Sequence, residues 1–120
     1  MGKRIEGTCY FKVDGVQLDL KGGIELPLFP TKKEATESIS GPTGFFKETD
    51  VIPFIKGSFL VPDEFPVDKL ATGKDMTITA ELANGLVYTL SGAFAVGDAN
   101  LKGDDGEVDL EFNGIKGMFQ

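Results

Sequence analysis

The sequence predicts a mainly β, antiparallel fold with one short helix. Two hairpin turns carry this prediction, because Asp14-Gly15 and Asn84-Gly85 each separate two runs of alternating apolar and polar residues. Both dipeptides tolerate positive φ at successive positions, as the type I′ turn of a two-residue hairpin requires. The strand pattern fits a sandwich or a partly closed barrel.

The first hairpin joins residues 5–13 to residues 16–20. On the first strand, Ile5, Cys9, Phe11 and Val13 fall on one face. Gly22-Gly23 interrupts the second strand, so we expect a bulge or bend there before a strand resumes over residues 24–29.

Residues 30–50 read as a long polar connection. Glycine and proline punctuate it at residues 41, 42 and 44, and Ile39, Phe45 and Phe46 are isolated apolar residues. Connections of this length without clear structure are uncommon inside compact domains and tend to be functional or mobile.

The second half predicts a strand over residues 51–61, with Pro53 biasing its start toward a sheet edge and Gly57 favouring a bend. A helix of about two turns follows Pro66 and stops at Gly73. The second hairpin covers residues 76–96, and a polar loop leads to the last predicted strand. On that strand Val108, Leu110 and Phe112 alternate with the polar residues Glu107, Asp109, Glu111 and Asn113.

Composition limits the possible functions. At 120 residues, we expect a single domain over residues 1–120 that buries its own core. The chain has no histidine, which excludes imidazole bases and ligands, and its net charge of −7 opposes a general grip on nucleic acid phosphates. No apolar run approaches the roughly 20 residues of a membrane span, so we expect a soluble, unprocessed intracellular protein without a membrane anchor.

We predict no catalytic residue, cofactor or metal. Residues 98–109 have the spacing of an EF-hand loop, but Lys102 occupies a ligand position and Asp109 replaces the final glutamate. Residues 41–44 lack the lysine of a phosphate-binding loop.

The acidic face of residues 107–113 has two interpretations. Three carboxylates on alternate residues lie roughly 7 Å apart and repel one another, so the face needs water or cations beside it. It is either a solvated outer face or the wall of a water-filled passage to which an anionic polymer does not adhere.

Four stretches resemble the tail tube proteins of contractile-tailed phages, in particular the Mu-like group. They are RIEGTCYFKVDGVQL (residues 4–18), FFKETDVIPFIKGSF (45–59), ITAELANGLVYTLSGAFAVGD (78–98) and GEVDLEFNGIKG (106–117). They follow in order along nearly the whole chain. Related folds build the tubes of contractile bacteriocins and type VI secretion systems.

The resemblance implies a fold of two packed antiparallel sheets with one short flanking helix. It also implies a structural virion protein, the major tail tube subunit, made in the bacterial cytoplasm. Six copies would form a ring, and stacked rings a hollow channel through which DNA passes without specific binding. It also implies sheath, baseplate and terminator proteins as partners. The lumen candidates are Glu107, Asp109, Glu111 and Asn113, followed by Glu81 and Thr79.

We expect residues 31–50 to form an inter-subunit loop. Its candidate contact residues are Lys32, Lys33, Ile39, Phe45 and Phe46. The alternative function is a small β-barrel module that binds an apolar ligand or acts as an adaptor. A phage, a defective prophage and a bacteriocin particle all stay open as the source of the tube, as does whether the loop is ordered in the monomer.

Overall fold

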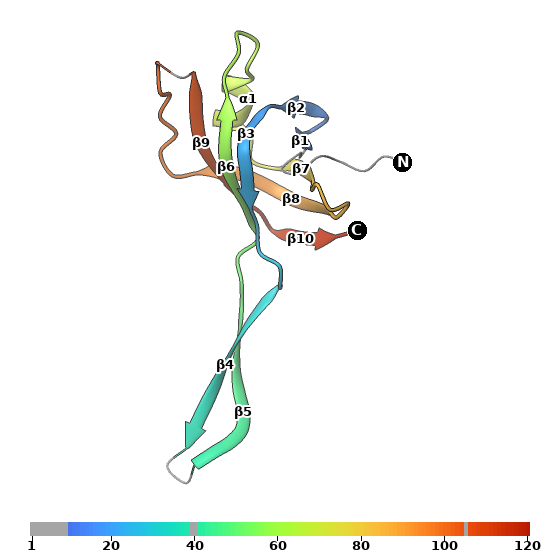
Figure 1. Ribbon diagram of the computed structural model, residues 1–120, viewed down its shortest axis with the longest axis vertical. Helices are drawn as coiled ribbons and strands as arrows, with labels where there is room; N and C mark the ends of the chain where they lie inside the picture. The colour runs from blue at the N-terminus through green and yellow to red at the C-terminus, as the bar shows by residue number, and fades with distance from the viewer. Residues whose placement is uncertain (1–9, 39–40, 105) are drawn as a thin grey trace.

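The computed structural model describes residues 10–38, 41–104 and 106–120 (Figure 1). The predictions made for Ile5, Cys9 and Ile39 lie outside these residues. For Phe45 only the backbone is described.

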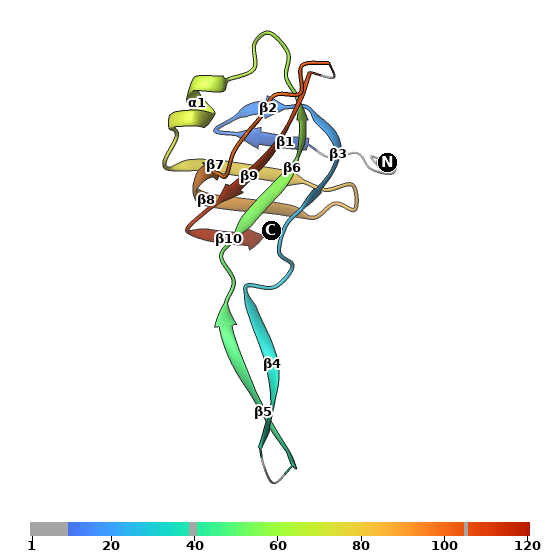
Figure 2. The same cartoon turned by 90° about the vertical axis from the view of Figure 1, so that its left-hand side faces the viewer.

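Two antiparallel sheets pack face to face, and we call them sheets A and B. Sheet A has the strand order β2-β1-β7-β8-β10, and sheet B has the order β3-β6-β9 followed by the end of β8. Figure 2 shows the strands of sheet B crossing in front of those of sheet A. The strands are β1 (Tyr10–Val13), β2 (Val16–Leu18), β3 (Leu20–Glu25), β6 (Phe54–Leu60), β7 (Met76–Glu81), β8 (Val87–Val96), β9 (Glu107–Asn113) and β10 (Lys116–Phe119).

The chain passes between the sheets at two corners. One corner lies between β2 and β3 at Asp19, whose carbonyl accepts a hydrogen bond of 2.9 Å from the Leu60 N–H. The other is inside β8 at Gly92, where φ is +64° and a Cβ would lie 2.7 Å from Ile115. Both observations require glycine there. The strand path ends at β2 and β3 without closing, so the fold is two packed sheets and not a closed barrel.

The space between the sheets is filled mainly by aromatic and branched side chains. The ring centroid of Phe11 lies 4.7 Å from that of Phe59 and 5.9 Å from that of Phe112. The alternation predicted for the last strand is confirmed, because Val108, Leu110 and Phe112 are buried. Other core residues are Val13, Ile55, Met76, Ile78, Ala80, Tyr88 and Leu90.

One of the two predicted turns is confirmed and the other is wrong. Asp14 and Gly15 have φ of 50° and 87° between the paired residues Val13 and Val16, as in a type I′ turn. The second hairpin has three loop residues, 83–85, because Leu82 N–H donates to the Leu86 carbonyl. Of these only Gly85 has positive φ, which makes a type I turn with a glycine bulge.

The helix α1 (Val67–Thr72) starts after Pro66 and stops at Gly73, as predicted. Gly73 does not adopt the left-handed conformation, since its φ is −65°. A Cβ there would lie 2.5 Å from the Met76 sulfur, so close packing between the helix and β7 explains the glycine. Among the described residues, no helix is long and apolar enough to cross a membrane.

The predicted unstructured connection is wrong, because residues 31–50 form a long hairpin. It consists of β4 (Thr31–Ser38) and β5 (Gly41–Asp50), which pair only with each other among the described strands. Opposite charges face each other across the pair: Lys33 Nζ lies 3.8 Å from Glu48, and Glu34 is opposite Lys47. Such pairs favour a hairpin that has no apolar face to reveal it.

The hairpin projects well beyond the sheets (Figures 1 and 2). The radius of gyration is 17.4 Å and the longest axis is 62 Å, whereas a compact domain of this length has a radius of about 14 Å.

The segment before the hairpin also differs from prediction. β3 ends at Glu25, after a bulge that the paired glycines predicted, and Leu28 and Phe29 are exposed.

Asp14 connects the first turn to two other elements. Its carboxylate accepts a 2.8 Å hydrogen bond from Thr77 N–H and lies 2.9 Å from Lys69 Nζ on α1. The Thr77 hydrogen bond, and then Lys69, hold the pKa of Asp14 below its ordinary value of 3.8. The carboxylate therefore stabilises the fold above its unfolded-state pKa, and this contribution is lost as the pH falls through the lowered value.

We predict that Asp14→Asn keeps the turn and the Thr77 hydrogen bond but loses the attraction to Lys69. The free energy of unfolding at pH 7 should fall by about 0.5 kcal/mol, because the pair is about one-third exposed and screened by water. In urea titrations the difference from the parent should shrink below about pH 4. A double-mutant cycle with Lys69→Met should show the same loss of coupling; coupling that is constant down to pH 2 would contradict the assignment.

Candidate assembly surfaces

The predicted lumen residues lie on two opposite outer faces. Asp109, Glu111 and Asn113 lie on the outer face of sheet B, where Glu107 belongs to the same alternation. Thr79 and Glu81 lie on the outer face of sheet A, alternating with buried residues of β7. Since outer faces of packed sheets look away from each other, these two sets cannot line one passage together.

Two carboxylates of this acidic face, Glu107 and Asp109, have lysines beside them, which meets the expectation that the face needs water or cations. Glu107 is only 9% exposed, forms a short ion pair with Lys21 and lies 3.9 Å from Lys102 Nζ. Asp109 accepts a 2.5 Å hydrogen bond from Ser58 Oγ and lies 3.3 Å from Lys102 Nζ. The Ser58 hydrogen bond, and then Lys102, lower the pKa of Asp109.

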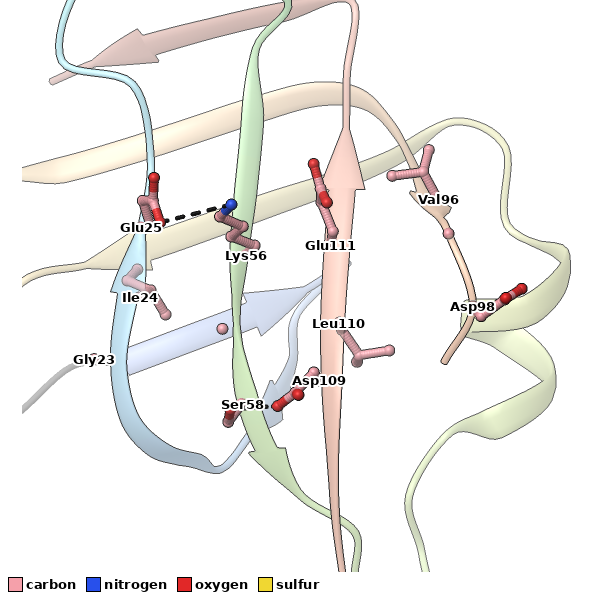
Figure 3. A pocket seen from close by; sticks show the side chains of 12 residues that line it. Gly23, Ile24, Glu25, Lys56, Ser58, Val96, Asp98, Asp109, Leu110 and Glu111 are labelled. Carbon is pink, nitrogen blue, oxygen red and sulfur yellow. Dashed lines mark hydrogen bonds and ion pairs between the residues drawn. The ribbon is translucent and has the colours of Figure 1, made fainter. Parts of the chain in front are cut away.

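The network continues across the sheet (Figure 3). Lys56 Nζ lies 3.7 Å from a carboxylate oxygen of Glu25. Lys56 is also the cross-strand partner of Glu111. The seven charged residues together hold three lysines and four carboxylates, so their net charge is only −1. They are Lys21, Lys56, Lys102, Glu25, Glu107, Asp109 and Glu111.

The outer face of sheet B is also concave. A groove of about 620 Å³ runs across it from Gly23 on β3 to Asp98 beyond β8. Figure 3 shows the side chains of Glu25, Lys56 and Glu111 on neighbouring strands beside this groove. This sheet therefore presents a concave outer surface on which carboxylates and lysines are interleaved.

The opposite face, on sheet A, is less charged. Its groove of about 330 Å³ is lined by Tyr10, Lys12, Gln17, Thr79 and Glu81. At the end of this face, the Gln120 amide donates to Thr89 Oγ1 at 3.2 Å.

The hairpin presents the predicted loop residues away from the core. The side chain of Phe46 is exposed, and Lys33 Nζ lies 5.7 Å from the centre of its ring. Lys32 and Lys33 line a groove of about 670 Å³ at the base of the hairpin. The same groove is lined by Leu28 and Phe29, which sequence reasoning missed because it extended β3 across them.

A second apolar surface lies beside α1. This groove, of about 340 Å³, has almost no polar lining and includes Val67 and Leu101, both 59% exposed. Its other lining residues are Val61, Phe65, Leu70, Ala71, Ala95, Ala99, Val108 and Leu110. No local sequence pattern predicted this groove, since it joins three separate stretches of the chain.

These surfaces suit contact with other molecules better than chemistry. No group of three or more acidic, cysteine or histidine side chains that could hold a metal occurs in the described part of the chain. In the segment with EF-hand spacing, Lys102 forms ion pairs with Glu107 and Asp109, so a lysine occupies the place where a calcium ion would need oxygen ligands. Between the sheets, Phe11, Phe59 and Phe112 occupy the space that a barrel with an internal ligand would leave open.

Comparison with known proteins identifies the family. The sequence matches the family described as phage tail tube protein over residues 2–118. The chain belongs to this family. Tail tube proteins are structural components of the virion tail and not enzymes, and the role of this chain is structural.

Solved structures share the fold of this tail tube protein. The sheath/tube terminator of the PVC extracellular contractile injection system, in its extended state, superposes with a TM-score of 0.68 at 9% identity, covering 98% of this chain and 96% of the other. The tube-terminating cap of the anti-feeding prophage gives 0.66 at 10% identity, covering 97% and 89%. A chain of the PVC sheath-tube complex gives 0.63 at 10% identity, covering 97% and 90%. A search of curated proteins finds no match.

We predict that Ser58→Ala raises the pKa of Asp109 toward its ordinary value of 3.8, because the largest cause of its lowering is removed. Carbon-detected NMR titration of the side-chain carboxyl measures this value directly. Ser91→Ala, which changes a serine on sheet A, is the matched control and should leave the Asp109 titration unchanged. An identical titration in both variants would show that Ser58 does not hold this carboxylate.

Proposed function

We propose that this chain forms hexameric rings that stack into a hollow tail tube for DNA delivery. The observation that carries the proposal is the β4–β5 hairpin, which extends away from the sheets of its own chain. An isolated two-stranded hairpin is marginally stable in water. A neighbouring subunit would cover its faces, and the hairpin would connect subunits or successive rings.

Unpaired strand edges support ring closure. Among the described strands, β3 pairs on one side with β6, and the end of β8 pairs with β9 at the other edge of sheet B. Free edges invite pairing with another chain, and head-to-tail pairing in a ring closes without aggregation. Pairing β3 of one subunit with the β8 end of the next would extend sheet B into a continuous wall.

The outer face of sheet B suits the lumen side of this wall. It is concave, its lysines and carboxylates are interleaved, and it carries Asp109, Glu111 and Asn113. Six copies of the chain carry a total formal charge of −42, so the tube as a whole would repel DNA, while the wall itself contributes only the small excess of its carboxylates over its lysines. Salt limits the repulsion to a layer of about 8 Å, which keeps DNA from adhering without blocking the passage. Thr79 and Glu81 would then face outward, toward the sheath.

The partners in this proposal are further copies of the chain, a sheath, a baseplate and a terminator. Support comes from the similar structures, which are a tube terminator, a tube-terminating cap and a component of a sheath-tube complex. The tube would assemble in the cytoplasm of the bacterial host and remain in the virion tail.

We predict that replacing residues 31–50 by Asn-Gly abolishes tube formation. Val51 N–H donates to the Pro30 carbonyl at 3.0 Å, which is the hydrogen bond that closes a two-residue hairpin, so a type I′ turn fits between Pro30 and Val51. The core residues are untouched, and the variant should stay folded. Negative-stain electron microscopy of the concentrated protein should show tubes for the parent and none for the variant.

The folded state of the hairpin variant is the control for this experiment. Its thermal transition should remain cooperative and near that of the parent. A folded variant that still forms normal tubes would contradict the proposed role of the hairpin in assembly. A concentrated parent that stays monomeric would sink the proposed function itself.

We predict that Asp109→Lys with Glu111→Lys permits assembly but slows DNA delivery, because a cationic wall binds phosphates. Glu107 is left unchanged, since a lysine there would meet Lys21 and Lys102. The matched control is Thr79→Lys with Glu81→Lys, which adds positive charge to the opposite face and should leave delivery unchanged. Delivery is timed by potassium release and DNA entry after infection. Slower delivery in the control pair alone would place the lumen on sheet A.

A further inference from the structure

A short apolar projection lies where the hairpin leaves the sheets. We call residues 27–30, with the sequence Pro-Leu-Phe-Pro, the shoulder. Leu28 is 64% exposed and Phe29 is 68% exposed. The two prolines lack an N–H, so covering the shoulder leaves fewer backbone donors without a partner. Exposed apolar side chains grouped in this way mark a contact surface.

The groove beside α1 is the complement of the shoulder. It is apolar and concave, whereas the shoulder is apolar and projects. The two lie at opposite ends of the body formed by the sheets, with α1 near one end and the hairpin base at the other (Figure 1). They therefore cannot meet within one chain, whereas head-to-tail stacking of two copies would bring them to the same interface.

Charges around the two surfaces have opposite sign. The cavity beside the shoulder is lined by Lys32 and Lys33 and by no carboxylate. The residues that adjoin the lining of the α1 groove in the sequence include the exposed Asp63, Glu64, Asp68 and Asp98. Lys69 and Lys102 adjoin it as well, but they pair with Asp14 and with Glu107 and Asp109, so the excess charge beside this groove is negative. Opposite charges at the rims of an apolar contact favour one orientation of the partner.

We propose that the shoulder of one copy fills the α1 groove of a second copy stacked on it. This inference rests on the proposed function and specifies a contact between successive rings. Leu28 and Phe29 would contact Val67 and Leu101, while the basic rim faces the acidic one. The hairpin of the first copy would then run alongside the second copy instead of ending at its surface.

Disulfide trapping tests this contact. In a Cys9→Ala parent, Leu28→Cys is combined with Leu101→Cys, tubes are assembled under reducing conditions, and the tubes are then oxidised. Because every copy carries both partners of the contact, non-reducing gels should show a ladder of multimers. Each single cysteine variant should stop at dimers.

The matched control combines Leu28→Cys with Val16→Cys, which is also a partly exposed apolar position but lies on β2. A ladder with Leu101→Cys that exceeds the control supports the contact. Tubes that form normally and give no ladder overturn the inference and leave the tube function intact. A Cys9→Ala parent without tubes overturns both.

Polymerisation measurements keep the inference testable if the cysteine pair disturbs assembly. Leu28→Ser and Leu101→Ser should each raise the critical concentration for tube formation at least tenfold, because a buried leucine is lost from the contact. Leu86→Ser, at an exposed leucine on the β7–β8 turn, should change it less than twofold. Equal effects of all three substitutions would contradict the proposal.

Discussion

The hairpin of residues 31–50 is the constraint on which the rest of the structure depends. Its strands pair with each other and with no other described strand, so neither face receives the support that a packed sheet has. The cross-strand pair of Lys33 and Glu48 sets its register, but exposed ion pairs contribute little stability. A protein that keeps such an arm needs something outside the chain to hold it, and the subunits of a tube would provide that.

The two packed sheets form a core of their own, apart from the hairpin, and present two separate outer faces. Phe11, Phe59 and Phe112 fill the space between them, and the described core cluster contains no residue of the arm. The bend of β8 at Gly92 places its ends in different sheets, and the corner at Asp19 does the same for β2 and β3. The outer faces consequently point in opposite directions and differ in charge. In the proposed tube, one face would line the passage and the other would meet a surrounding layer.

Local patterns in the sequence predicted the elements that depend on local chemistry. Alternation predicted β7 and β9, Asp14-Gly15 predicted its turn, and Pro66 with Gly73 bounded the helix. The hairpin was missed because an unpacked strand pair has no apolar face and so no hydrophobic period. The pairing of Glu107 with Lys21 was missed because the two lie 86 residues apart and meet only through the sheet register. β10 was missed because Lys116–Phe119 is short and contains a glycine.

Hydrogen exchange of the hairpin amides tests the central claim most directly. In the dilute monomer, the amides of β4 and β5 should exchange orders of magnitude faster than those of β7 and β9, because the pair opens without disturbing the core. In assembled tubes, the same hairpin amides should become protected while the core amides change little. Hairpin amides that are equally protected in monomer and tube would contradict the claim that other subunits hold the arm.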